Sequence, residues 1–489
     1  MRDYSPKRRT ALVLAGSGTA GAYHAGVVKA LDESGVKVDV VVGSGAGTVG
    51  AVFAALAGGE RLHGPAAFWR DVTWSDFYGL RAALRLFVLV LSIGFGVFLL
   101  PVLLAVFAGL FFPLFLVADL VAPAWTARMA ETLMLVPAAL RTPYLGALAA
   151  PTFVLSLTAA VWTGVALLRD RRRLVEAFES PLTAVPLERR LRRDLLEVAR
   201  QSALGDGQVA AGEVGRRCVA ALVENLGQPG FRELVLRAAD LETGAALSFV
   251  LLREPHRAAY LAARGRGRAG GASTVDLGAR GYEPLLFPAV LAGLLPAPLA
   301  PAVRVTFPRG GLFGAETHRL ADGALAGGCG ISEALRAGAE QVIVACAVPE
   351  EASLPLRRRG PHAAAEGLVA TLERQSFERE LEQTHRLNRL VETMGHRTED
   401  GSRAWEDPAT GRLYRDVAVY VVRPERRALG PLDFDGVLDR TREVLETTDD
   451  LVDQGHRDAY RLFLEPVLGA APDLARPSEH EPEERTLGL

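Results

Sequence analysis

The fold is decided by the stretch Val42-Gly43-Ser44-Gly45-Ala46-Gly47, a glycine-rich turn between an apolar run at 38–42 and a small-residue segment at 46–56. The β-branched run predicts a buried strand, and the small-residue segment predicts a helix. In the strand-turn-helix elbow of many hydrolases, G-x-S-x-G, the nucleophilic serine is the middle residue. Here the middle residue is Gly45, and Ser44 stands one place earlier. The sequence therefore predicts an elbow whose hydroxyl is displaced.

A second strand-turn-helix unit precedes this elbow. An apolar run at 11–14 leads into Gly16-Ser17-Gly18-Thr19-Ala20-Gly21, and apolar residues recur at helical spacing over 25–31. A glycine loop at a helix start presents backbone N–H groups, which bind a phosphate or the oxyanion of an acyl-transfer intermediate. A dinucleotide site would need an acidic residue at the end of the second strand. Asp39 stands at the start of that strand, so we favour an oxyanion loop.

A third block, Asp322-Gly323-Ala324, follows much later in the chain. Together, the three blocks resemble the patatin-like phospholipase family: 14–23 its oxyanion loop, 42–47 its nucleophile elbow, and 322–324 its aspartate motif. The likeness covers about residues 9–80 and 175–465, with an insertion between them. It implies an α/β fold, a three-layer α/β/α hydrolase domain that cleaves acyl esters of lipids with a serine–aspartate dyad. We expect no metal ion and no cofactor.

The chain departs from the pattern of this family at several points of the site. Gly45 stands at the position of the serine nucleophile, Ser17 replaces a glycine of the oxyanion loop, and Ala20 replaces a basic residue. Gly328 and Gly330 follow the aspartate motif where Asn and Pro are common. Because glycine has no atom that can attack a carbonyl, the covalent route is closed if Gly45 occupies the elbow. We therefore expect a catalytically impaired protein that binds or acts on acyl lipids.

The alternative is an active lipid acyl hydrolase that attacks from Ser44, with Asp322 as its base. The elbow needs small residues two places before and two places after the nucleophile. With Ser44 as the nucleophile these residues are Val42 and Ala46, and the β-branched Val42 meets the requirement poorly. The non-catalytic explanation of Ser44 is that its hydroxyl forms hydrogen bonds with local backbone groups of the turn. In both cases the same glycine-rich positions frame the site: Gly16, Ser17, Gly18 and Gly21 as oxyanion donors, and Gly43 and Gly47 in the elbow.

The insertion contains two long uncharged stretches, residues 86–118 and 142–168. Each is longer than the roughly 20 residues with which a helix crosses a bilayer. We expect a transmembrane hairpin with helices at about 86–110 and 145–168. Arginines lie just before the first stretch and just after the second, at 81, 85, 169 and 171–173. By the positive-inside rule, both outer ends of the hairpin are cytoplasmic.

The two halves of the hydrolase-like domain must meet on one side of the membrane, because the elbow precedes the insertion and Asp322 follows it. This requires an even number of crossings, and two is the simplest number. The expected organisation is a first part at 1–80, a membrane insertion at 81–174, a second part at 175–469 and a disordered tail at 470–489. The expected partner is a membrane lipid, and the α/β domain is expected in the cytoplasm.

The overall composition adds few constraints. The 489 residues are 49% hydrophobic with a net charge of −2, so nothing points to nucleic acid. The three cysteines lack metal-ligand spacing. The polar stretch at 1–9 runs straight into the first strand, so we expect no signal peptide. Charged residues alternate with leucines and valines at helical spacing over 377–394, which predicts a surface helix.

Overall fold

The structure, a computed structural model, describes most of the chain outside the insertion. The described residues are 4–57, 60–64, 67–81, 182–199, 210–226, 232–262, 273–295, 300–309, 313–349, 361–398, 403–408, 412–426, 429–439 and 444–469, with scattered positions between 85 and 161.

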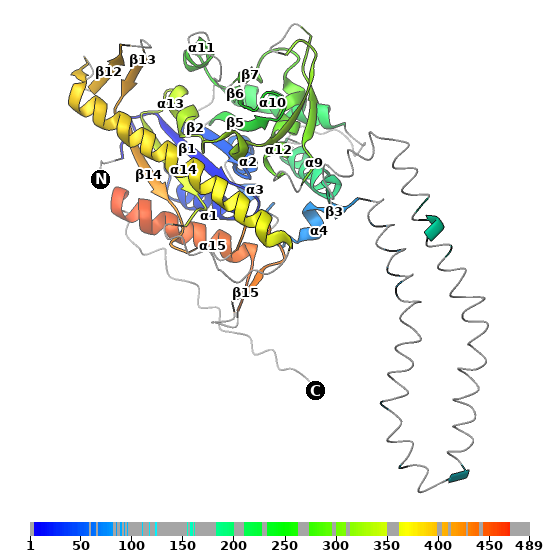
Figure 1. The fold of residues 1–489 in the computed structure, drawn as a ribbon. Coiled ribbons are helices and arrows are strands. Elements are labelled where there is room, and N and C mark those ends of the chain that lie inside the picture. Colours follow the sequence, from blue (N-terminus) through cyan, green and yellow to red (C-terminus); the bar gives the residue numbers. More distant parts are fainter. Residues whose placement is uncertain are drawn as a thin grey trace. The chain divides into compact units, whose positions relative to one another are not determined.

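Within this part of the chain, a nine-stranded mixed sheet forms the centre of the fold (Figure 1). Its main path runs β14-β10-β1-β2-β5-β6-β7, and β9 joins β5 and carries β8. The strands β14, β10, β1, β2 and β5 are parallel, whereas β6 and β9 are antiparallel to β5. The bounds are β1 Thr10–Gly16, β2 Val40–Gly45, β5 Glu233–Asp240, β6 Ala245–Leu251, β7 Ser273–Asp276, β8 Val303–Thr306, β9 Thr317–Asp322, β10 Gln341–Cys346 and β14 Ala418–Val422.

Helices cover both faces of the sheet. On one face, Val13 and Val42 share a buried cluster with Ile331 of α13 (Ile331–Arg336) and Phe377 of α14 (Pro361–Met394). Since successive side chains of a strand alternate between faces, Leu14 points to the other face. There it meets α2 (Gly47–Ala57), which packs beside α1 (Ala20–Glu33). The predicted α/β class is therefore found, as a sheet between two layers of helices.

The other elements surround this core. They are α3 Glu60–His63, α4 Trp74–Phe77, α9 Val185–Ala199, α10 Ala211–Asn225, α11 His256–Ala262, η3 Glu283–Leu285, α12 Leu286–Gly293, η4 Gly323–Ala326, β11 His396–Arg397, β12 Arg403–Asp407, β13 Arg412–Arg415, β15 Val437–Asp439, β16 Val444–Glu446, α15 Thr448–Ala459 and the π-helix η5 Tyr460–Leu468.

The chain divides into two compact units, residues 1–78 with 184–489, and residues 79–183. In the second unit, β3 (Gly79–Leu80) pairs antiparallel with β4 (Leu182–Thr183), so the two ends of the segment between them are adjacent. The hairpin helices expected at about 86–110 and 145–168, like the tail at 470–489, lie outside the described residues. Among the residues that are described, none of the helices has the length and apolar character needed to cross a membrane.

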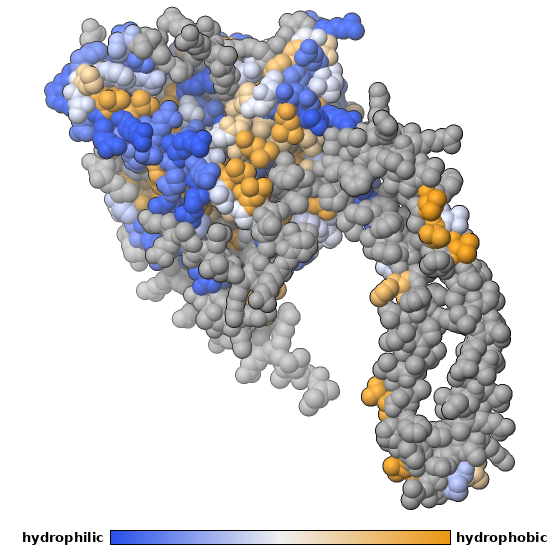
Figure 2. All heavy atoms as spheres, in the orientation of Figure 1, coloured by the Kyte–Doolittle hydropathy of each residue, from blue (hydrophilic) through white to orange (hydrophobic). Residues whose placement is uncertain are grey.

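The long helix α14 crosses one side of the sheet (Figure 1). It extends well beyond the surface helix expected at 377–394, because it begins at Pro361. Glu373, Phe377, Glu380 and Thr384 are buried at a spacing that places them on one face of the helix. Figure 2 shows hydrophilic residues along its outer side. The amphipathic helix was therefore predicted correctly, but three carboxylates of α14 are buried, those of Glu366, Glu373 and Glu380.

Candidate functional site

The three sequence blocks meet where neighbouring strands end. Gly16 and Gly45 are register partners at the carboxyl ends of β1 and β2. On β5, Arg237 is the register partner of Ser44, and the next residue, Ala238, is the partner of Asp322 on β9. The carboxyl ends of strands in an open α/β sheet are the usual position of a ligand site. The topology therefore brings the oxyanion loop, the elbow and the aspartate into one place.

Gly45 is the apex of the elbow. Its φ angle is +64°, in the left-handed region that favours glycine, and α2 begins two residues later. A Cβ built on Gly45 would lie 3.2 Å from Oδ1 of Asp322, so a side chain at this position would face the aspartate. The same Cβ would lie only 2.4 Å from the carbonyl oxygen of Gly16. Any larger residue at 45 therefore requires the Gly16 carbonyl to move.

The elbow turn is as crowded as the sequence motif implies. A Cβ on Gly43 would lie 2.6 Å from the carbonyl oxygen of Gly47, and one on Gly47 would lie 2.0 Å from that of Leu14. Both positions therefore require glycine because backbone approaches them closely.

The side chain of Ser44 lies on the face of β2 that packs against α13 and α14. Its side chain is 3% exposed and lines a small cavity of about 20 Å³. Gly16, Glu373, Ser376 and Phe377 also line this cavity. The Ser44 hydroxyl approaches Gly323, since a Cβ built on that glycine would lie 3.0 Å from its Oγ. Ser44 is thus close to the aspartate motif, but the hydrogen bonds of Asp322 go to other groups.

The carboxylate of Asp322 is buried and engaged on both oxygens. Oδ1 accepts a hydrogen bond from the N–H of Ala324 at 2.9 Å, and Oδ2 accepts one from the hydroxyl of Ser17. Burial raises the pKa of Asp322 to about 7 from its ordinary value of 3.8, against the effect of these hydrogen bonds. The negative charge of Glu373 raises this pKa further, and Arg237 lowers it. The hydroxyl that meets the aspartate therefore comes from the oxyanion loop.

The N–H groups around this loop are bonded within the protein. Ser17 donates its N–H to Oε1 of Glu373, and Thr19 donates its N–H to the carbonyl of Pro431 at 3.1 Å. Ala46, next to the apex, donates its N–H to the carbonyl of Gly16 at 2.7 Å. In an active elbow, the N–H after the nucleophile is an oxyanion donor. In this conformation these three donors are not available to a ligand.

Gly18 and Gly21 have packing roles in the predicted oxyanion loop. Gly18 has a φ of +57°, and a Cβ there would lie 1.7 Å from the carbonyl oxygen of Pro431. A Cβ on Gly21, in the first turn of α1, would lie 1.9 Å from the Trp69 ring. The loop thus sits tightly under the segment that contains Pro431.

A buried ionic network supports the loop after Asp322. The guanidinium of Arg237 lies 3.1 Å from Glu333 and donates a hydrogen bond to the carbonyl of Gly327 at 2.6 Å. Glu380 of α14 accepts the N–H groups of Cys329, Gly330 and Ile331 at 2.9–3.0 Å, and the hydroxyl of Ser332. Although burial opposes it, the charge of Arg237 and these hydrogen bonds lower the pKa of Glu380.

Sequence reasoning did not identify Glu373, Arg237 or Glu380 as part of the site. The only sequence signal is the spacing of two acids seven residues apart on a helix, with Phe377 between them on the same face. Among the described residues, the His, Cys, Asp and Glu side chains form no group that could hold a metal ion.

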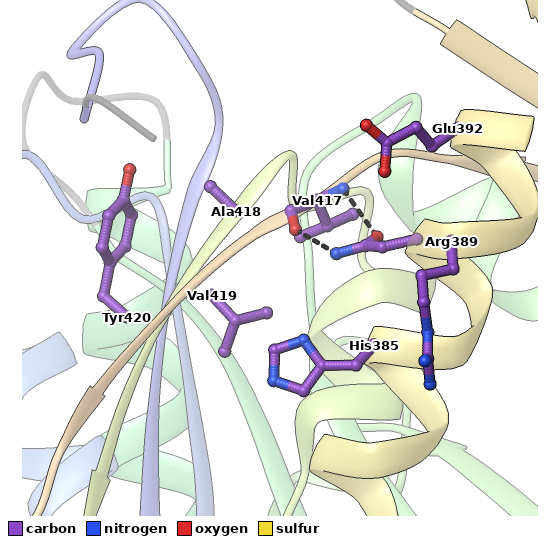
Figure 3. A pocket seen from close by; sticks show the side chains of 8 residues that line it. His385, Arg389, Glu392, Val417, Ala418, Val419 and Tyr420 are labelled. Atoms are coloured by element: carbon purple, nitrogen blue, oxygen red, sulfur yellow. Dashed lines mark hydrogen bonds between the residues drawn. The ribbon is translucent and has the colours of Figure 1, made fainter. Parts of the chain in front are cut away.

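A larger hollow of about 450 Å³ lies between α14 and the edge strand β14 (Figure 3). His385, Arg389 and Glu392 line it from the helix, and residues 417–420 line it from the strand. The Asn388 side chain donates to the carbonyl of Val417 at 2.7 Å and accepts its N–H at 3.1 Å. This hollow shares no lining residue with the cavity beside Ser44. It therefore does not extend the site at Asp322.

A family model described as patatin-like phospholipase matches residues 12–335. This range contains the oxyanion loop, the elbow and the aspartate motif, but neither α14 nor the segment around Pro431. A comparison with curated proteins found no match.

Proposed function

The chain belongs to the patatin-like phospholipase family, and on that premise we propose that it is a membrane-anchored protein that binds acyl lipids and is impaired in covalent catalysis. Family membership supports a function of the lipid acyl hydrolase type. The observation that carries the finer proposal is the position of Gly45. Gly45 occupies the elbow apex, where a side chain would face Asp322. Because glycine has no side chain, the aspartate has no apex hydroxyl to activate.

The chemistry of acyl transfer explains the expected impairment. A covalent route needs a hydroxyl whose proton is removed by a base, and donors directed at the oxyanion that forms. Asp322, with a pKa of about 7, is suited to accept a proton near neutral pH. Its serine partner, Ser17, is completely buried and does not line the cavity. Any remaining hydrolysis then proceeds by direct attack of water on the ester. Its rate is orders of magnitude below that of an enzyme with an intact nucleophile.

The proposed membrane anchor rests on the sequence of the insertion. The uncharged stretches at 86–118 and 142–168 are each long enough to cross a bilayer. The segment at 79–183, which contains both stretches, is one of the two compact units into which the chain divides. The arginines at its outer ends favour a cytoplasmic α/β domain. The lipid substrates or ligands would then be those of the same membrane.

The second candidate function is active hydrolysis of lipid acyl esters from Ser44. It is favoured by one observation, the position of Ser44 in the wall of the cavity next to the aspartate motif. This route requires the Asp322 carboxylate to exchange Ser17 for Ser44 as its partner. The two functions differ in whether Ser44 is needed for turnover.

The experiment that tests the proposal uses the full chain in detergent. A phospholipid with a photoactivatable acyl chain should cross-link to peptides that contain residues 14–23 or 42–48, and excess unlabelled phospholipid should compete. Turnover of a short-chain fluorogenic ester should be the same in the native chain and in Ser44→Ala. Failure to cross-link at these peptides would contradict lipid binding, and turnover lost in Ser44→Ala would establish the hydrolase.

A further inference from the structure

The oxyanion loop is closed by two segments that lie outside the family-matched residues 12–335. Glu373 of α14 accepts the N–H of Ser17. Thr19 donates its N–H to Pro431 and its hydroxyl to the carbonyl of Gly430 at 2.7 Å. In a ligand-bound acyl-transfer site, loop N–H groups of this kind hold an acyl oxygen. Here a carboxylate oxygen of Glu373 and the carbonyl oxygen of Pro431 accept the hydrogen bonds of these N–H groups.

The position of Glu373 is fixed by its neighbours on α14. Phe377, one turn later, is completely buried in the core under the sheet. Glu380, another turn on, accepts three backbone N–H groups of the loop before and at the start of α13. Because these three residues share one helix face, Glu373 meets Ser17 whenever the helix is docked. The contact is therefore part of the docked state of α14.

The space left beside the site is too small for an acyl chain. The cavity between Glu373, Ser44 and Gly16 has a volume of about 20 Å³, roughly what one water molecule needs. Ser17 and Thr19 are completely buried. A lipid can reach the loop only after α14 has moved.

We propose that α14 is a latch. In the closed state, the Glu373 carboxylate accepts the hydrogen bond from the Ser17 N–H that the carboxylate or carbonyl oxygen of an acyl lipid accepts in the open state. Opening of the latch exposes this N–H to the lipid. The part that opens is the part of α14 that precedes Phe377, because Phe377 is buried in the core and Glu380 is held by Cys329, Gly330 and Ile331. This inference rests on the proposed acyl-lipid function, and its ligand class is a fatty acyl carboxylate.

The first test measures amide hydrogen exchange by mass spectrometry on the full chain in detergent. In Glu373→Ala, exchange in the peptide that contains Ser17 should rise about tenfold or more, as expected for the loss of one buried charge-assisted hydrogen bond. In Glu373→Gln, the amide oxygen still accepts the N–H, so the rise should be smaller. This second variant keeps the test valid if Glu373→Ala folds poorly.

Two variants on the same helix serve as controls. Glu382→Ala removes an exposed acid that pairs with Arg386, and Val391→Ala removes buried apolar volume far along the helix from Ser17. Neither should raise exchange at Ser17, although Val391→Ala should lower the melting temperature. Equal exchange in native, Glu373→Ala and Glu373→Gln chains would overturn the latch, as would an equal rise in the controls.

The second test measures binding of oleate, with oleyl alcohol as the matched ligand without a carboxylate. Glu373→Ala should bind oleate about tenfold more tightly than the native chain, and should not bind oleyl alcohol more tightly. Faster exchange at Ser17 with no gain for oleate would leave the latch standing and contradict the acyl-lipid function that it serves. No gain for oleate together with unchanged exchange would overturn the latch itself.

Discussion

At the scale of single residues, the central feature is a buried aspartate whose hydroxyl partner is Ser17. Oδ2 of Asp322 accepts from Ser17, while the apex glycine leaves the space in front of Oδ1 without a side chain. The sequence placed Ser17 and Asp322 in the site separately, because each belongs to a different block. It could not pair them, since the pairing depends on how the fold brings together the ends of β1 and β9, two strands that β2 and β5 separate in the sheet.

The raised pKa of Asp322 predicts a pH dependence of stability. Its folded-state pKa, about 7, exceeds the ordinary value of 3.8, so between these values the native state binds more protons than the unfolded state. Stability from this group is therefore present below about pH 4, falls as pH rises toward 7, and is constant above. Over this window Asp322→Asn should lose a pH-dependent contribution of at most roughly 4 kcal/mol. Melting temperatures of both chains in detergent at several pH values measure it, and parallel curves would contradict it.

A serine at the apex should not restore reactivity alone. In Gly45→Ser, the new Cβ meets the carbonyl oxygen of Gly16, and Ser17 still holds Asp322. The double variant Gly45→Ser with Ser17→Gly frees Asp322 for the new hydroxyl, so its labelling by a fluorophosphonate should exceed that of Gly45→Ser about tenfold or more. Ser17→Gly alone is the control. Equal labelling of the single and double variants would show that Ser17 does not limit the site.

At the scale of elements, the strands and helices near the elbow follow the sequence pattern closely. The strand expected at 38–42 is β2, Val40–Gly45, and the helix expected at 46–56 is α2, Gly47–Ala57. The strand runs further because Gly43, Ser44 and Gly45 continue the register pairing with β1. In contrast, the charge pattern of α14 gave no indication that Glu373 and Glu380 would be buried. Their partners are loops far away in the sequence, which periodicity does not report.

The role of Glu380 predicts a large difference between two acids on α14. Glu380→Ala leaves three N–H groups without their carboxylate and should destabilise the protein by about 3 kcal/mol or more. Glu382→Ala, at an exposed position, should change stability by less than about 0.5 kcal/mol. Denaturant unfolding followed by circular dichroism compares the two. Similar midpoints would mean that Glu380 does not hold the loop before α13.

At the scale of the whole molecule, the sequence blocks were sufficient to predict the family and the α/β class. The order of the three blocks carries this information, because each marks the end of a strand that the fold brings together. The closure of the site was not predictable, since α14 and the segment around Pro431 lie outside those blocks.

The pairing of β3 with β4 predicts that the insertion can be removed. Leu80 and Leu182 are register partners, so a short hairpin turn in place of 82–181 should join the two strands. The native chain should remain with membranes after alkaline extraction, and the shortened chain should be released while its circular dichroism keeps the α/β signature. A native chain that is extracted by alkali would contradict the proposed anchor.

The most direct test of the account is the intact mass of the native chain after incubation with a fluorophosphonate, beside Ser44→Ala, Ser17→Ala and the double variant Gly45→Ser with Ser17→Gly. We predict no adduct on the native chain or on either alanine variant, and an adduct at residue 45 of the double variant. An adduct on the native chain that maps to Ser44 and is lost in Ser44→Ala would contradict the claim that the glycine apex prevents covalent catalysis.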